Sequence, residues 1–198
     1  MVGSALISVF DKTGLDSLVG VFSKRNVEIM GSGGTAEAVR KLGHAVVDVS
    51  EYTGFPEMPG GLVKTLHPKI HAGILGDWND PVQRKYLEAN NVRPLDFVVV
   101  NLYPFQEVVK SDPTNMKRAV DNIDIGGVAL IRAAAKGALL NKRVVPVTSP
   151  LQYERIATEL EEKGKVESET RVKLAGQAFA LTAEYDSSIR EYLAGFAK

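Results

Sequence analysis

Apolar and polar positions follow two alternating patterns along the chain. Short apolar runs, which are typical of buried strands, predict strands at 5–10, 27–30, 45–49, 96–101 and 143–148. Segments with apolar residues three or four positions apart predict helices at 15–25, 36–42, 81–90, 115–121, 126–136, 152–163 and 170–196. Continuous apolar strands that alternate with helices need cover on both faces. The sequence therefore predicts an α/β protein, a Rossmann-like parallel sheet of about five strands with helices on both faces.

The predicted helix at 170–196 is longer than an average helix of a globular domain. One of its sides carries Val172, Ala175, Phe179, Thr182, Ile189 and Leu193. We expect this long C-terminal helix to pack against a partner or to lead to another domain. The 198 residues are enough for a sizeable core, and we expect a single domain over residues 1–198.

Composition and charge narrow the possible partners. The 24 basic and 24 acidic residues cancel, so an anionic ligand must be met by a local site and not by a general basic field. The lack of cysteine excludes disulfides and thiolate chemistry. The N-terminal sequence has no basic region ahead of its apolar run, and no run approaches the ~20 residues that span a bilayer. We expect a cytoplasmic protein with no nucleic-acid or membrane partner.

The turn Gly31-Ser32-Gly33-Gly34-Thr35 lies between a predicted strand and a predicted helix. With Ala36 it fits the G-x-G-x-x-A pattern of dinucleotide-binding proteins, but the acidic residue that this pattern needs about 20 residues later is misplaced here. A monophosphate site fits better, because consecutive backbone N–H groups, two hydroxyls and a helix N-terminus would surround the anion. An inert glycine turn is the alternative. Lys12, just after the first predicted strand, is a further candidate phosphate contact.

The stretch 60–73 is predicted to be a partly buried loop. Its terminal glycines and Pro68 break a helix, yet its apolar residues need burial, namely Leu62, Val63, Leu66 and Ile70. Such a loop would carry Lys64 and Thr65 at a partly desolvated place. A solvated basic turn is the alternative interpretation.

His67 and His71 have the i, i+4 spacing of zinc ligands on a helix. Pro68 between them argues against that helix, and no third ligand is evident. We therefore expect structural or hydrogen-bonding histidines and no metal.

Polar residues follow the clearest predicted strand. Asn101 and Tyr103 come at its C-terminal end, which is where open parallel sheets bind ligands. Asp124 and Lys136 lie in a strongly apolar segment, before and at the far end of a predicted helix. Burial there would give both groups unusual proton affinity, although an ordinary ion pair is the alternative. These residues indicate a phosphate-bearing small ligand without defining the reaction.

Six blocks of the chain resemble, in the same order, the IMP cyclohydrolase domain of the bifunctional purine-biosynthesis enzyme (AICAR transformylase/IMP cyclohydrolase). The blocks are SVFDKTG at 8–14, GSGGT at 31–35, EYTGFPEM at 51–58, VKTLHPK at 63–69, NLYPF at 101–105, and IDIGG with RAAAK at 123–127 and 132–136. The resemblance implies a methylglyoxal-synthase-like fold, a homodimer and no cofactor or metal. It implies closure of 5-formamidoimidazole-4-carboxamide ribonucleotide (FAICAR) to inosine monophosphate (IMP) with loss of water. In that family a transformylase domain follows, and this chain stops about where it would start.

The resemblance also implies roles for individual residues. The substrate phosphate would be held by Lys12, Ser32, Gly33, Gly34, Thr35 and Thr65. The base pocket would be lined by Asn101, Ile125, Gly126 and Gly127, and the ring closure would be served by Lys64, Tyr103, Asp124 and Lys136. Asp124 suits the proton that the carboxamide nitrogen must lose. The formyl oxygen gains charge, and clustered lysines that lower one another's pKa, together with Tyr103, suit that oxygen.

Three positions depart from the family pattern, which usually has serine at Phe10, arginine at Leu62 and asparagine at Gly137. Two of them are expected near the phosphate. A non-catalytic nucleotide-sensing module of the same fold, as in carbamoyl phosphate synthetase, is the alternative function. It would need the phosphate turn but not the four ring-closure residues together. Methylglyoxal synthase is less suitable, because the glycine turn offers no carboxylate.

Overall fold

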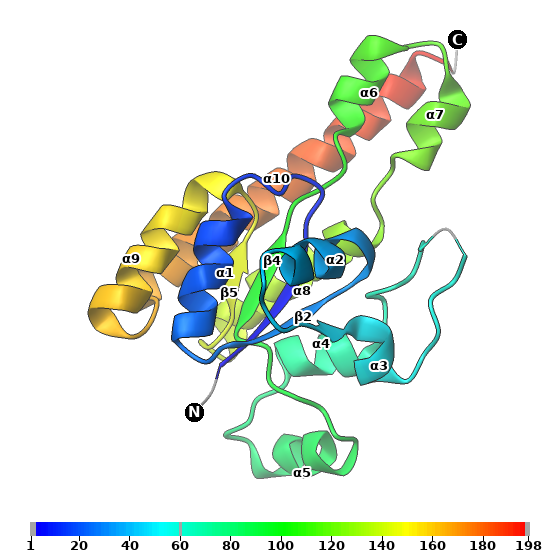
Figure 1. Ribbon diagram of the computed structural model, residues 1–198. Coiled ribbons are helices and arrows are strands. Elements are labelled where there is room, and N and C mark those ends of the chain that lie inside the picture. The colour runs from blue at the N-terminus through cyan, green and yellow to red at the C-terminus, as the bar shows by residue number, and fades with distance from the viewer. Residues whose placement is uncertain (1–2, 60, 197–198) are drawn as a thin grey trace.

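The structure is a computed structural model that describes residues 3–59 and 61–196. Its centre is a five-stranded, fully parallel sheet with the strand order β3-β2-β1-β4-β5 (Figure 1). The strands are β1 (Ser4–Ser8), β2 (Glu28–Gly31), β3 (Val47–Asp48), β4 (Phe97–Val100) and β5 (Val145–Val147). All five lie within the predicted strand segments or within two residues of them. The order reverses direction at β1, which places the ends of β1, β2 and β4 side by side.

Helices cover both faces of the sheet, as predicted. Alternate residues of β1 and β4 point to opposite faces, so Ile7 and Val99 belong to one buried cluster and Leu6 and Val98 to another. The first cluster includes residues of α1 (Leu15–Lys24), α2 (Gly33–Lys41) and α9 (Tyr153–Lys163). The second includes residues of α4 (Pro68–Leu75) and α8 (Gly126–Leu140). Each face thus has a separate apolar core.

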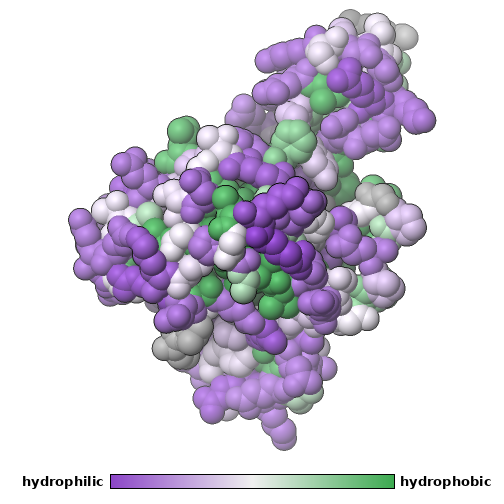
Figure 2. Space-filling view, viewed as in Figure 1, coloured by the Kyte–Doolittle hydropathy of each residue, from purple (hydrophilic) through white to green (hydrophobic). Residues whose placement is uncertain are grey.

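The C-terminal helix α10 (Ser168–Ala194) runs past the sheet and supports a protruding arm (Figure 1). Its first half packs against α8 and β5, and its second half meets α6 (Phe105–Ser111). A third apolar cluster, centred on Phe105, Ala119 and Tyr185, joins α10 to α6 and α7 (Met116–Asp121). The visible face of this arm is mostly hydrophilic (Figure 2). The long helix was expected to pack against a partner, but α6 and α7 of the same chain cover part of its second half.

The prediction of a buried, helix-free loop at 60–73 is wrong. Helix α4 begins at Pro68, because a proline at the first helical position needs no N–H partner and its φ already suits a helix. His67 caps this helix, and its Nδ1 accepts a hydrogen bond of 3.1 Å from the Lys69 N–H. Leu62 is 67% exposed, and Val63 and Leu66 are exposed as well, whereas Ile70 is buried.

Three further short helices were not predicted. They are α3 (Val49–Thr53), α6 and the 3-10 turn η1 (Pro150–Gln152). α3 and η1, with five and three residues, are too short to show a clear helical period in the sequence. The helix predicted at 81–90 is present as α5 (Pro81–Ala89). Among the described residues, no helix combines the length and the apolar character that crossing a membrane requires.

Candidate functional site

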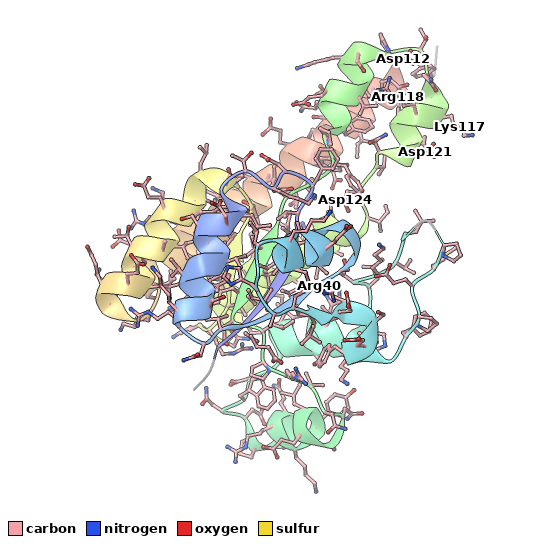
Figure 3. All side chains as sticks on the ribbon, viewed as in Figure 1. Arg40, Asp112, Lys117, Arg118, Asp121 and Asp124 are labelled. Carbon is pink, nitrogen blue, oxygen red and sulfur yellow. The ribbon has the colours of Figure 1, made fainter. Side chains whose placement is uncertain are left out.

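The candidate site is built at the C-terminal edge of the sheet. The segments after β1, β2 and β4 leave the sheet next to one another, because these strands are neighbours and run in the same direction. Asp124 approaches the same edge from the segment before α8, between the sheet and the arm of α6 and α7 (Figure 3). The fold thus brings the predicted phosphate turn and two predicted ring-closure residues to one edge.

The glycine turn after β2 forms the predicted helix N-terminus. Ser32 is the N-cap residue of α2, and Gly33 takes a left-handed conformation with a φ of +50°. A Cβ at Gly34 would meet no atom within 4 Å, so ligand atoms have room there. Free N–H groups at the start of a nine-residue helix favour an anion.

The Thr35 hydroxyl is engaged within the protein. Its Oγ1 accepts a hydrogen bond of 3.0 Å from the Val9 N–H and lies 3.2 Å from the Val9 carbonyl oxygen, to which it donates. Thr35 is buried. The side chain therefore joins the end of β1 to α2, and the turn offers its backbone N–H groups more readily than this hydroxyl.

Asn101 organises the loop that carries Lys12. Its Oδ1 accepts hydrogen bonds from the N–H groups of Phe10 and Asp11 at 2.7 and 3.0 Å, and its Nδ2 donates to the Asp11 carbonyl at 2.8 Å. Lys12 is exposed, and its Nζ donates to the Phe10 carbonyl at 3.2 Å. Asn101 thus holds the loop that carries Lys12, a predicted phosphate contact, and it also lines the cleft described next.

An open cleft of about 740 Å³ lies beside this loop. Its lining includes Phe10, Lys12, Tyr103, Thr148 and Tyr185. The rings of Phe10 and Tyr103 meet edge to face at 5.6 Å, and about half of each side chain is exposed. Phe10, one of the departures from the family pattern, therefore gives the cleft an aromatic wall of the kind that stacks on a planar ring.

Lys64 and Thr65 approach the site from the stretch before α4. The Lys64 ammonium lies 2.9 Å from Glu57 Oε2 and so close to the glycine turn that a Cβ on Gly33 would be 2.5 Å from it. The buried Thr65 hydroxyl would lie 3.1 Å from a Cβ on Gly126, at the start of α8. Lys64 therefore lies beside the glycine turn, and Thr65 lies beside the start of α8.

Asp124 is held by backbone groups in front of α8. Its Oδ1 accepts a hydrogen bond of 2.7 Å from the Gly127 N–H, and a Cβ on Gly127 would be only 2.5 Å from its Oδ2. Burial raises the pKa of the carboxyl, and hydrogen bonds from the Gly127 and Tyr103 backbones offset part of that rise. Within the described residues this carboxylate has no ion-pair partner.

Lys136 is not buried, contrary to expectation. It follows Gly126 by ten positions on α8, which is about 15 Å along the helix axis. It is exposed and lines a separate groove of about 500 Å³ with Arg132, Leu139, Leu140 and Phe179. The expected cluster of Lys64 and Lys136 is therefore not formed within one chain. Ile125, placed in the base pocket by the resemblance, is 60% exposed.

Two contacts at the site were missed by sequence reasoning. Glu57 pairs with Lys64 although seven positions separate them, and its only signal was its place in the block at 51–58. Tyr185 hydrogen-bonds to Asp124 across 61 positions, for which the sequence carries no local signal. Across residues 3–59 and 61–196, no group of three or more His, Asp or Glu side chains is arranged to hold a metal ion.

Comparison with known proteins agrees with this architecture. The MGS-like domain family matches residues 14–129, and the AICARFT/IMPCHase bienzyme family matches residues 134–198. The bifunctional purine biosynthesis protein PurH of Leptospira biflexa is 46% identical over 189 residues, which is 95% of this chain and 36% of that protein. PurH of Synechocystis is 44% identical over 196 residues, 98% of this chain and 38% of that protein. The chain thus spans little more than a third of the length of these relatives.

A solved structure described as the crystal structure of ForH has the same fold. The TM-score is 0.83 at 27% sequence identity, and the match covers 98% of this chain and 100% of that one. The predicted methylglyoxal-synthase-like fold and the resemblance to the bifunctional purine-biosynthesis enzyme are confirmed. The chain belongs to the MGS-like domain family, and nearly its whole length is similar to PurH proteins.

Proposed function

We propose that this chain is an IMP cyclohydrolase that closes FAICAR to IMP with loss of water in purine biosynthesis. The observation that carries the proposal is the meeting of the glycine turn, Tyr103 and Asp124 around one open edge of the sheet. Its support from relatives is the similarity to proteins named as bifunctional purine biosynthesis proteins. We also propose a cytoplasmic location and a nucleotide, not a nucleic acid, as the ligand.

The phosphate of the nucleotide would bind at the glycine turn. The N–H groups at the start of α2 would meet its oxygens, with Lys12, Ser32 and Thr65 beside them. The aromatic wall of Phe10 and Tyr103 would then accept the imidazole ring. This arrangement holds the formamide against the carboxamide, and such proximity is worth ~7–11 kcal/mol of the barrier in favourable cases.

Asp124 would act as the general base. The carboxamide nitrogen must lose a proton as it attacks the formyl carbon, and a carboxylate with a raised pKa is a better acceptor than an ordinary exposed one. The oxygen of the formyl group gains charge in this step and leaves as water, whose two protons balance one lost by the carboxamide nitrogen and one lost by the formamide nitrogen. Tyr103 and Lys64 would stabilise and protonate that oxygen, for which Lys64 must leave Glu57.

The test is to incubate the chain with FAICAR and to follow the purine absorbance of IMP. Turnover that increases in proportion to protein concentration supports the proposal. Tight binding of IMP in calorimetry without any turnover would favour the nucleotide-sensing module instead. Neither binding nor turnover would refute both functions.

We further propose a homodimer that brings Lys136 to the site of the other copy. Lys136 is too far along α8 to serve the Asp124 of its own chain. The exposed face of α8 carries Ile125, Leu139 and Leu140, which are 60%, 49% and 57% exposed, in addition to Arg132 and Lys136. Two copies of α8 packed antiparallel would bury these apolar side chains and bring each lysine toward the partner's helix N-terminus.

Mixing two inactive variants tests this shared site. If each site takes Asp124 from one chain and Lys136 from the other, a dimer of an Asp124→Ala chain and a Lys136→Ala chain has one intact site. Activity should return in the mixture, up to about a quarter of the wild-type value per chain for random pairing. A monomer by light scattering, near 21.4 kDa, or a mixture that stays inactive while dimeric, would contradict the shared site.

A further inference from the structure

We propose that Tyr185 on α10 is a positioning residue that holds Asp124 in place for ring closure. The proposal deepens the function proposed above and rests on it. Its basis is a hydrogen-bonded connection between the long C-terminal helix and the backbone on both sides of residue 123. Nothing in the local sequence around Asp124 provides this connection.

The phenol oxygen of Tyr185 joins two backbone groups. It accepts a hydrogen bond of 2.8 Å from the Asp124 N–H, and it donates one of 3.0 Å to the Asn122 carbonyl oxygen. Burial raises the pKa of this phenol, so the hydroxyl keeps its proton at neutral pH and can make both bonds together. Because both hydrogen bonds go to the backbone, the hydroxyl fixes the chain direction from which the Asp124 carboxyl enters the site.

Apolar packing makes Tyr185 a firm support. It is 7% exposed and lies in the third apolar cluster, where its ring meets Phe105 at a centroid distance of 6.1 Å. Leu102 and Ile123 pack against the same cluster. These two residues are the sequence neighbours of Tyr103 and Asp124, so one cluster supports both segments that carry candidate catalytic side chains.

The arm and the long helix would help to order the segment that carries Asp124. α6 and α7 lie on the second half of α10 and are separated from the sheet (Figure 1). Their packing orders the stretch of α10 that carries Tyr185, and Tyr185 in turn orders the segment before α8. The arm would thus act on Asp124 through Tyr185.

The test compares Tyr185→Phe with Tyr192→Phe. Tyr192 belongs to the same helix and cluster, and its ring lies 5.8 Å from Phe105. Its buried hydroxyl has no hydrogen-bond partner in the part of the chain that the structure describes. Both variants therefore lose one buried hydroxyl from the same surroundings, but only the first loses contact with Asp124.

We expect Tyr185→Phe to lower kcat roughly three- to tenfold, since one or two neutral hydrogen bonds are lost, with KM changed less than twofold. Tyr192→Phe should keep both values within twofold. A kcat for Tyr185→Phe within twofold of wild type, or an equal loss in both variants, would overturn the positioning role.

Amide hydrogen exchange separates this proposal from the proposed function. The segment 122–127 should exchange faster in Tyr185→Phe than in wild type and Tyr192→Phe, whether or not the chain turns over FAICAR. Unchanged exchange there would refute the structural connection itself. Faster exchange in a chain without cyclohydrolase activity would refute the function while leaving the connection standing.

Discussion

The two halves of the candidate site are built in different ways. The proposed phosphate half is a short contiguous turn at a helix N-terminus, where backbone N–H groups of neighbouring residues would be the main ligands. The proposed ring-closure half consists of Tyr103 and Asp124, whose segments contact Tyr185 and its apolar cluster on a distant helix. The comparison indicates that the first half resists remote substitutions and that the second half is sensitive to them.

The largest effect should come from the ring-closure half. Asp124→Asn keeps the size of the side chain and an oxygen for the Gly127 N–H, but it removes the proton acceptor. We expect kcat to fall at least ~100-fold with a small change in KM, because general base catalysis contributes about 10²–10⁴-fold. Asp121→Asn, at an exposed acidic residue three positions earlier, is the control in the same absorbance assay. A variant at Asp124 that turns over like its control would remove the base from the mechanism.

Substitution of Lys12 should affect the phosphate half in the opposite manner. Lys12→Ala is expected to raise KM roughly tenfold with kcat almost unchanged, because the phosphate contact is the same in the ground state and in the transition state. Lys24→Ala, at an exposed lysine on the far end of α1, is the control. A fall in kcat without a rise in KM would show that Lys12 acts on the reacting atoms.

Leu62→Arg should strengthen the phosphate half. Leu62 is 67% exposed, so a guanidinium has room, and a charge-assisted hydrogen bond would tighten IMP binding by roughly tenfold. Calorimetry measures the dissociation constant, with Val82→Arg at another exposed apolar position as the control. Equal constants in both variants and wild type would place the phosphate away from residue 62.

Thr35→Val tests the side-chain hydroxyl that joins the end of β1 to α2. It would leave the buried Val9 N–H without its partner and lower the free energy of unfolding by about 1–3 kcal/mol in urea denaturation. Thr35→Ser keeps the hydroxyl and should lose less. If Thr35→Val is as stable as Thr35→Ser and binds IMP more weakly, the hydroxyl serves the ligand.

The smallest effect concerns the pH dependence of stability. Burial raises the pKa of Asp124 in the folded state, so its contribution to stability is present at low pH and is lost as the pH rises through that pKa. Asparagine does not ionise. The free energy of unfolding of Asp124→Asn, relative to wild type, should therefore increase between about pH 3 and about pH 7. A relative value that falls over this range would show that the carboxylate is stabilised in the fold.

The spacing of apolar residues was enough to predict the strands and the long helix, and the glycine-rich motif at 31–35 was enough to predict the turn between β2 and α2. Buried strands and the strand-turn-helix unit at 31–35 depend on neighbouring residues, whose spacing is visible in the chain. Six sequence blocks were enough to indicate the family. Local rules failed at Pro68. Proline breaks a helix when it lies in the interior, but Pro68 is the first residue of α4, where proline is favoured.

Only the tertiary structure decided which side chains meet. The burial of Asp124, the exposure of Lys136 and the Tyr185 contact all depend on how α8 and α10 lie against the sheet, which no local pattern encodes. Asp124 and Lys136 are close in sequence and share one apolar segment, yet Asp124 precedes α8 and the helix carries Lys136 about 15 Å along its axis from Gly126. Tyr185 lies 61 positions from Asp124 and touches it, because the chain folds back through α10 to cover the end of α8.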